Sequence, residues 1–345
     1  MRYLNIWVIQ RNGLVSASVK TTSYEINRDY ITSEKSTFEV SEALDFAKGD
    51  FLMAKFPHGE GLAFLGLIDS YENKTIVCED LFSIVDFEFP ATRMSGKSFE
   101  QHAKNLINRY LLQDANKIID ILDVETRTST NHIYQPAEPP TPTNLQKYLI
   151  NAFKKYNVVW RIDSYENFRI KSVIERVSST LNLKNNNNVF VDWDISTVEV
   201  GRGIENHLQI VNKNTTNSEG PNILSEWWLT INNEVTQNAN HPDIVRPTKT
   251  KIWIYDTTEE EKPSYQDVAE SELKGSYYAH EITFKMPIEN ELIKFEDLNI
   301  GRLTNIIYDD KQYQSVLTGY LLTGESDYIE LRFGHIRSRL SELLE

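Results

Sequence analysis

Cysteine is nearly absent from the sequence: Cys78 is the only one in 345 residues, which excludes an internal disulfide. It ends the run Thr75-Ile76-Val77-Cys78, where a small buried side chain is expected rather than a nucleophile. No apolar run approaches the roughly 18 residues that a membrane-spanning helix needs. Residues 1–7 also lack the apolar stretch and cleavage site of a signal peptide. We therefore expect synthesis in a cytoplasm, no export by the general secretory route and no membrane-spanning segment.

Motifs for nucleotide binding and nucleophilic catalysis are missing as well. The sequence has neither the GxxxxGK[ST] loop that cradles phosphates nor the GxSxG turn that presents a catalytic serine. Gly201-Arg202-Gly203 is too short for a dinucleotide-binding loop. A zinc-binding helix would need two histidines four residues apart, and none of the seven is so spaced: His58, His102, His132, His207, His241, His280 and His335. We expect no catalytic residue, no cofactor and no metal.

Positive charge is in short supply, with 36 basic residues against 50 acidic ones and a net charge of -14. A surface of this kind repels phosphate, which argues against a protein that grips DNA or an anionic membrane. Two interpretations remain open. The negative charge keeps the protein soluble, or it lines a conduit through which nucleic acid passes without sticking.

The aromatic content favours β structure, since the chain holds 17 tyrosines, 15 phenylalanines and 6 tryptophans. Residues 1–92 contain short apolar runs separated by turn residues, a pattern typical of a small barrel or sandwich. The predicted strands in this part are 3–10, 36–40, 51–56, 62–70 and 75–78.

The middle part, residues 93–190, predicts a mixture of helices and strands. A helix begins after Ser98, which forms a capping box with Gln101, and a second begins after Thr143, paired in the same way with Gln146. A proline-bearing connector, 133–142, separates them. Strands at 158–163 and 168–173 are expected to follow.

The last part, residues 191–345, again predicts mostly strands. In the final strand Ile329, Leu331 and Phe333 alternate with polar residues, which indicates a sheet with one wet face. Ser264 caps a short helix that ends at Leu273. The other expected strands are 189–193, 197–200, 207–212, 226–231, 250–255, 282–286, 303–308 and 312–323, and a terminal helix follows residue 334.

These patterns predict an α+β, mainly β fold: two small antiparallel β-barrels with an α+β middle region. The predicted domains are 1–92, an N-terminal tube-like β-barrel; 93–190, an α+β middle domain; and 191–345, a second β-barrel with an inserted α+β segment. A length of 345 residues suits two or three domains.

Three groups of residues invite a functional interpretation. Asp192 and Asp194, with Glu199 nearby, could form an acid/base pair for glycoside cleavage, although a solvated strand face explains them better. Trp227 and Trp228 are adjacent on a strand and must face opposite ways, so they cannot form one sugar-binding platform. One is expected in the core and the other in a second core layer or as an interface anchor.

The third group is the stretch 143–190, which has eight basic residues against three acidic ones and several interleaved aromatic rings. Single-strand nucleic-acid binders combine a basic groove with stacking rings in this way. Helical and strand periodicity assigns several of the rings to a core, however. A docking face for an acidic neighbouring subunit is the favoured interpretation.

The C-terminal region resembles a known family through Ile300-Gly301, Tyr308, Tyr313, Ser315, Leu317-Thr318-Gly319, Phe333-Gly334, Arg337 and Leu340. Earlier residues fit the same pattern, namely Gly49-Asp50, Phe64-Leu65-Gly66, Asn144-Leu145, Asn206 and Trp228. The family is the baseplate hub, or tail-associated lysin (Tal) structural domain, of siphophages that infect Gram-positive bacteria, which is similar to the hub proteins of contractile-tailed phages.

The resemblance implies a structural protein of the virion tail tip, encoded by a phage or a prophage. It implies a homotrimer that caps the tail tube, with two barrels per chain matching the sixfold ring above, and that opens for DNA ejection. The implied partners are the distal tail protein ring, the tape-measure protein, and fibre or receptor-binding proteins, while DNA passes without specific binding. The implied interface residues are Phe333, Arg337, Leu340 and Trp228.

Two other functions remain open at this point. A cell-wall hydrolase would use Asp192, Asp194 or Glu199, and a carbohydrate-binding adhesin would use exposed tryptophan and tyrosine rings. Longer relatives in the resembled family continue into a lysin domain, which we expect this chain to lack. We therefore expect no enzymatic activity.

Overall fold

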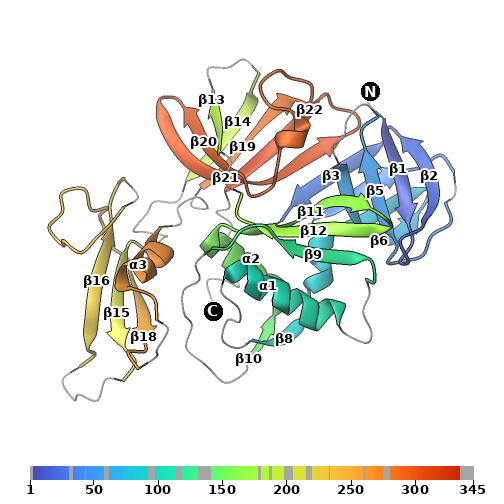
Figure 1. Cartoon of the computed structure of the whole chain (residues 1–345). Helices are drawn as coiled ribbons and strands as arrows, with labels where there is room; N and C mark the ends of the chain where they lie inside the picture. Colours follow the sequence, from blue (N-terminus) through green and yellow to red (C-terminus); the bar gives the residue numbers. More distant parts are fainter. Residues whose placement is uncertain are drawn as a thin grey trace.

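The computed structural model describes residues 3–30, 34–42, 44–57, 62–91, 98–113, 119–130, 141–177, 180–185, 189–197, 205–214, 220–232, 234–258, 262–274 and 280–334. Thirteen strands within these residues form one continuous sheet, to which both the beginning and the end of the described chain contribute (Figure 1). The mainly β, α+β class is thereby confirmed.

The N-terminal part of the large sheet contains seven strands in the spatial order β3-β4-β7-β6-β5-β1-β2, all antiparallel. Their inward residues are fully buried, for example Phe38, Phe51 and Phe64. Cys78 is among the buried residues, as the sequence predicts. The strands are β1 (Leu4–Ile9), β2 (Val15–Thr21), β3 (Tyr24–Asp29), β4 (Lys35–Glu39), β5 (Phe51–Lys55), β6 (Leu62–Glu72) and β7 (Thr75–Asp80).

The C-terminal part contains six strands. Four follow the order β14-β19-β22-β21; β20 pairs with the first half of β21, and β13 pairs with β20. The predicted alternation is confirmed: Ile329, Leu331 and Phe333 are all fully buried. The strands are β13 (Thr180–Lys184), β14 (Val191–Thr197), β19 (His280–Pro287), β20 (Leu303–Tyr308), β21 (Lys311–Thr323) and β22 (Tyr328–Gly334).

The two parts meet where β21 pairs with β3, residues 319–323 against 25–29. Gly319 makes this contact possible, because a Cβ there would lie 2.3 Å from the carbonyl oxygen of Arg28. Arg28 forms an ion pair of 2.7 Å with Asp80, and both side chains are mostly buried. The hydroxyl of Tyr320 donates to the carbonyl oxygen of Ala63 at 3.0 Å. A strand from the end of the chain is therefore fixed to strands from its beginning.

A smaller layer lies below the large sheet in Figure 1, where a three-stranded sheet is covered by two helices. Phe99 and Phe153 from the helices pack edge to face at 5.9 Å, and Phe82 contacts Trp160 of the sheet at 5.8 Å. The elements of this layer are β9 (Leu122–Thr126), β11 (Val159–Glu166), β12 (Arg169–Glu175), α1 (Phe99–Ile107), α2 (Leu145–Tyr156), the pair β8 (Glu88–Ala91) and β10 (Thr141–Asn144), and the short helical turns η1 (Leu81–Val85) and η2 (Asn108–Leu112).

A four-stranded sheet with one helix lies to the side of the other layers (Figure 1). One face of the sheet is buried against the helix through residues such as Leu208, Trp227 and Leu229 on the strands and Val268 and Leu273 on the helix. The elements are β15 (His207–Asn212), β16 (Ile223–Leu229), β17 (Val235–Thr236), β18 (Thr250–Tyr255) and α3 (Tyr265–Leu273); a further turn, η4, spans Phe295–Asp297.

Two of the three predicted helix caps are confirmed, and one is wrong. The hydroxyl of Ser98 accepts the backbone N–H of Gln101 at the start of α1, as predicted, while the Gln101 amide donates to Asn105. The prediction of Thr143 as the cap of α2 is wrong by one residue, because Asn144 accepts the N–H of Lys147 instead. The predicted cap of α3 at Ser264 is confirmed.

The two-barrel arrangement is not confirmed, because the described strands form an open sheet whose main path ends at β2 and β14, with β13 as a third edge strand that pairs only with β20. Strand β13, from the predicted middle domain, pairs with β20 of the C-terminal part. The domain limits 1–92, 93–190 and 191–345 stay predictions.

We predict that Gly319→Val destabilises the protein by about 1–3 kcal/mol, because the added side chain must displace the β3 backbone. Leu321→Val on the same strand removes one methylene from a half-buried side chain and serves as the control, with an expected loss of about 1 kcal/mol or less. Urea unfolding measures both. Equal losses would contradict a sterically tight junction.

We also predict that His280 makes the stability of the folded protein sensitive to acid. Burial lowers the pKa of His280 to about 4, so the folded protein holds this side chain neutral at pH values where the unfolded chain binds a proton. The stability is complete above the unfolded pKa of about 6.5 and is lost as the pH falls towards 4. His280→Phe is expected to remove about 2 kcal/mol of the stability loss between pH 8 and pH 5. Parallel pH profiles of the two proteins would contradict this assignment.

Candidate functional site

The two ends of the large sheet are the first candidate for a contact surface. Among the described strands, β2 and β14 each pair on one side only, which leaves one row of backbone groups on each without a strand partner. Both strands have seven residues. Strand β2 carries Lys20 and no acid, whereas β14 carries Asp192 and Asp194 and no base. Unpaired edges are templates for pairing with another chain.

The sequence predictions missed strand β2, although a signal was present. Val15, Ala17 and Val19 alternate with Ser16, Ser18 and Lys20, which is the period of a strand with one half-buried face. The small polar residues weaken this signal, because serine is also common in loops.

Asp192 and Asp194 lie exposed on β14. Asp192 has a left-handed backbone, φ 55°, at an irregularity in the pairing of β14 with β19, and its carboxylate lies 3.0 Å from the Nζ of Lys285. Trp193 between them packs on the Phe284 ring at 4.2 Å. This is the solvated strand face that the sequence favours over a catalytic pair. Glu199 lies outside the described residues.

Trp227 and Trp228 face opposite ways, as predicted. Trp227 is buried beneath α3, while Trp228 is half-buried on the outer face of the four-stranded sheet, stacked on His207 with ring centroids 4.7 Å apart. His207 in turn contacts Thr250 at 2.8 Å. Burial lowers the pKa of His207, and the nearby carboxylate of Glu226 opposes that effect.

The other predicted interface residues divide into two groups. Phe333 is fully buried and its ring stacks on Phe284 at 5.3 Å, so its contacts within this chain are core contacts. Arg337 and Leu340 lie outside the described residues. A role for any of these three at a subunit interface stays a prediction.

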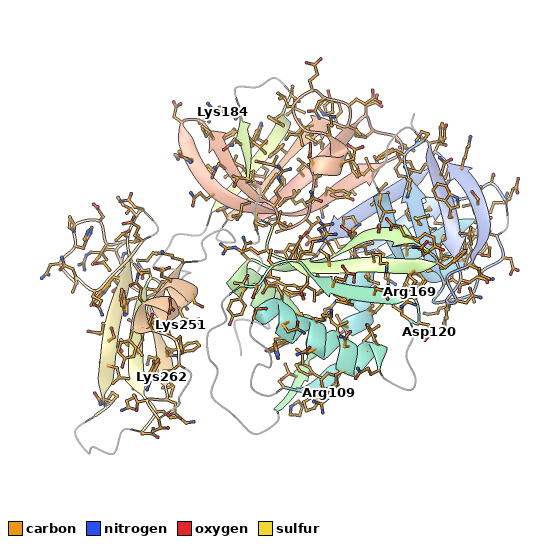
Figure 2. The ribbon with its side chains drawn as sticks, viewed as in Figure 1. Arg109, Asp120, Arg169, Lys184, Lys251 and Lys262 are labelled. Carbon is orange, nitrogen blue, oxygen red and sulfur yellow. The ribbon has the colours of Figure 1, made fainter. Side chains whose placement is uncertain are left out.

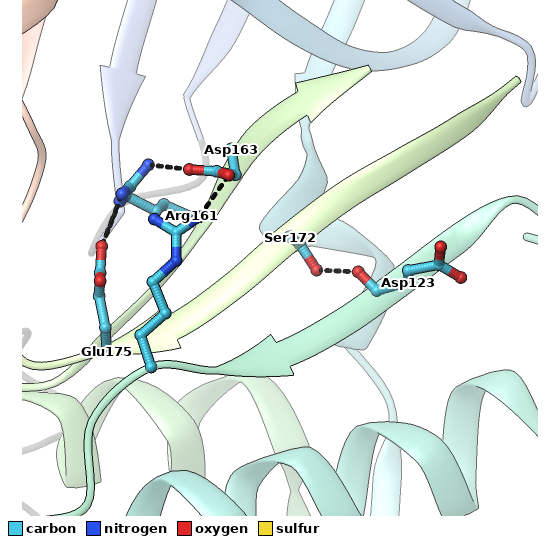
Figure 3. Close-up of polar contacts among 6 residues, drawn as sticks. Asp123, Arg161, Asp163, Ser172 and Glu175 are labelled. Atoms are coloured by element: carbon cyan, nitrogen blue, oxygen red, sulfur yellow. Dashed lines mark hydrogen bonds and ion pairs between the residues drawn. The ribbon is translucent and has the colours of Figure 1, made fainter. Parts of the chain in front are cut away.

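Acidic partners neutralise three of the eight basic residues of the stretch 143–190. Arg161 bridges Asp163 and Glu175 on the face of β11 and β12 (Figure 3). Arg169 and Lys171 both contact Asp123 of β9, and the hydrogen bond from Arg169 lowers the pKa of Asp123 to about 2.

The aromatic rings of the same stretch are mostly internal. Tyr156 and Trp160 are buried, and burial raises the pKa of Tyr148 to about 12. The described residues therefore offer neither a continuous basic groove nor a row of open rings for nucleic acid. Phe168 is the exception among the rings, because its side chain is 59% exposed.

A cleft of about 550 Å³ lies between β11 and the lower side of the large sheet. Its charged lining mixes both signs, with Arg28, Lys55 and Arg161 near Asp163 and Glu296. No described histidine or cysteine lines it, and no cluster in the described parts of the chain could hold a metal ion. None of the described helices combines the length and the apolar character that crossing a membrane requires.

Comparison with solved structures shows what fold this is. The chain is similar to a 43 kDa tail protein of prophage MuSo2 from Shewanella oneidensis (13% identity, TM-score 0.54, 97% of this chain and 98% of that one). It is similar to a tail protein from Neisseria meningitidis, with 13% identity, a TM-score of 0.55 and coverage of 96% of each chain. It is also similar to the prophage tail protein gp18 from Listeria monocytogenes, with 11% identity, a TM-score of 0.51 and coverage of 100% of this chain and 98% of that one. At these identities the likeness establishes a shared fold over the whole chain.

No protein-family model matches the sequence, and no curated protein matches it significantly. The expected resemblance to phage tail proteins is thus supported at the level of fold. The narrower assignment to tail-associated lysins of phages with Gram-positive hosts stays a prediction.

We predict that Trp227→Ala and Trp228→Ala have different effects on stability. The first removes a buried side chain from the contact with α3 and should cost about 3–5 kcal/mol. The second removes a half-buried ring and its stack on His207 and should cost about 1 kcal/mol. Thermal or urea unfolding measures both, and a larger loss for Trp228→Ala would contradict the assignment of the two faces.

Proposed function

We propose that this chain is a structural component of a phage or prophage tail tip. The single observation that carries the proposal is that its fold matches those of three tail proteins from end to end, in this chain and in theirs. The mixed-charge lining of the cleft, where Arg161 is paired with Asp163, supports a structural rather than an enzymatic role.

In more detail, we propose a homotrimeric hub that caps the tail tube and forms the conduit for DNA ejection. The N-terminal and C-terminal parts of the large sheet are two β-rich units joined at β3 and β21. Three chains would supply six such units, which suits a ring of six above them. The open edges at β2 and β14 support this arrangement, because head-to-tail contacts between unlike surfaces generate closed rings.

The proposed partners follow from this position. The distal tail protein ring would lie above the hub, the tape-measure protein inside it, and fibre or receptor-binding proteins outside. A net charge of -14 supports a conduit that DNA passes without specific binding. The hub would be made in the cytoplasm of the bacterial host and would act at the tail tip of the virion.

Labelling of virions tests the proposal directly. Antibodies raised against this chain are expected to bind the tail tip in electron micrographs of particles released by the host that carries the gene. Labelling of the head or along the tail, or none on intact tails, would contradict a hub. Purified protein should also leave the turbidity of bacterial cell walls unchanged, whereas clearing would favour the hydrolase.

A further inference from the structure

The turn of the hairpin formed by β11 and β12 contains a residue that is unusual at this position. Its two-residue turn consists of Asn167 and Phe168, which both have left-handed backbones, with φ of 52° and 61°. Such a turn favours Asn followed by Gly, because a bulky side chain is strained there. The Phe168 ring is 59% exposed, so it gains little burial within the chain. Folding of this chain alone would be served better by glycine.

The tip of this hairpin is fixed in place rather than projecting freely. It packs on the turn between β1 and β2, where a Cβ added to Gly13 would lie 2.1 Å from the carbonyl oxygen of Phe168. The hydroxyl of Tyr165 donates a hydrogen bond to the carbonyl oxygen of Gly13. Figure 2 shows Arg169, the next residue, beside the N-terminal strands at this end of the molecule. A ring held on a rigid backbone loses little entropy when it binds a partner.

Two further exposed apolar residues adjoin this tip. Leu14 and Val15 follow Gly13 directly and are 50% and 46% exposed. We call Leu14, Val15 and Phe168 the hairpin-tip patch. Val15 is also the first residue of β2, so the patch continues the unpaired edge of the large sheet.

We propose that the hairpin-tip patch is the apolar anchor of a contact between two copies of this chain, and that it receives the β14 end of the next copy. The proposal rests on the proposed function, whose ring requires two unlike surfaces to meet. Charge complementarity selects the β14 end of the next copy, because β2 carries Lys20 and no acid, whereas β14 carries the exposed Asp194 in addition to Asp192, whose carboxylate is already paired with Lys285 of its own chain. In an antiparallel arrangement of the two seven-residue strands, the Lys20 end of β2 meets the Asp192 end of β14.

A few residues, often with large aromatic side chains, carry most of the binding energy of a protein–protein interface. Strand β2 itself offers mainly serine, alanine and valine side chains, which give a flat contact of low specificity. Phe168 supplies the large side chain that β2 lacks, from a segment about 150 residues away in the sequence.

Phe168→Gly tests the proposal in the full chain. The change removes the ring and relieves the backbone, so the thermal midpoint of the monomer should stay the same or rise. The concentration at which the trimer half-dissociates should rise by about tenfold or more, measured by analytical ultracentrifugation. Ile231→Ser is the matched control, since Ile231 is 70% exposed but lies in the turn that follows β16 of the four-stranded sheet; it should leave assembly unchanged.

A cross-link tests whether β14 of the next copy lies beside β2. The double variant Ser18→Cys, Asp194→Cys should form disulfide-linked dimers and trimers under mild oxidation, because these two exposed positions lie opposite each other when Lys20 faces Asp192. Each single variant should not cross-link; the native Cys78 is buried and stays inert. A trimer that Phe168→Gly does not weaken, or that does not cross-link, overturns the inference and leaves the tail-hub proposal standing. A wild-type chain that is monomeric at every concentration overturns the self-contact, whereas the virion labelling decides the function separately.

Discussion

The structure depends on one junction, where the strand β21 from the end of the chain pairs with β3 from its beginning. Strand β21 is 13 residues long, and its first half pairs with β20 while its second half pairs with both β22 and β3. Its length lets it pair with all three neighbours. Gly319 lets the backbones meet, and the Arg28–Asp80 ion pair supplies partners for charges that would otherwise be buried alone.

The junction determines which surfaces remain for other proteins. Since it joins the inner edges of the two β-rich parts, one side each of β2, β14 and β13 is left without a strand partner in the described structure. The three-stranded sheet below has its charges paired across its own face, as in the Arg161, Asp163 and Glu175 cluster. A hub built from this chain would therefore assemble through the ends of the large sheet rather than through the charged middle layer.

Sequence patterns predicted the elements with strong local signals. The limits of β18 and β20 agree with the prediction to the residue, and Ser98 and Ser264 cap their helices as expected. The weakly apolar strands β2 and β3 were missed, because their conformation comes from pairing with β1 and β21 rather than from their own side chains. The parallel pairing of β13 with β20 joins residues more than 120 positions apart, and no local pattern encodes such a contact.

The candidate surfaces were predictable to a similar degree. Alternation along a strand was enough to place Trp227 and Trp228 on opposite faces. It could not show that Asp123 neutralises Arg169 and Lys171, since the partners come from different strands. The position of Phe168 could have been suspected from a two-residue loop between strands, but its contact with Gly13 is a property of the fold.

An electron cryomicroscopy reconstruction of the tail tip that contains this chain tests the central claim most directly. The account predicts a threefold ring in which strand β2 of each copy lies beside β14 of the next, around a central channel. A reconstruction in which both edges face solvent, or in which the chain is present in a single copy, would contradict it.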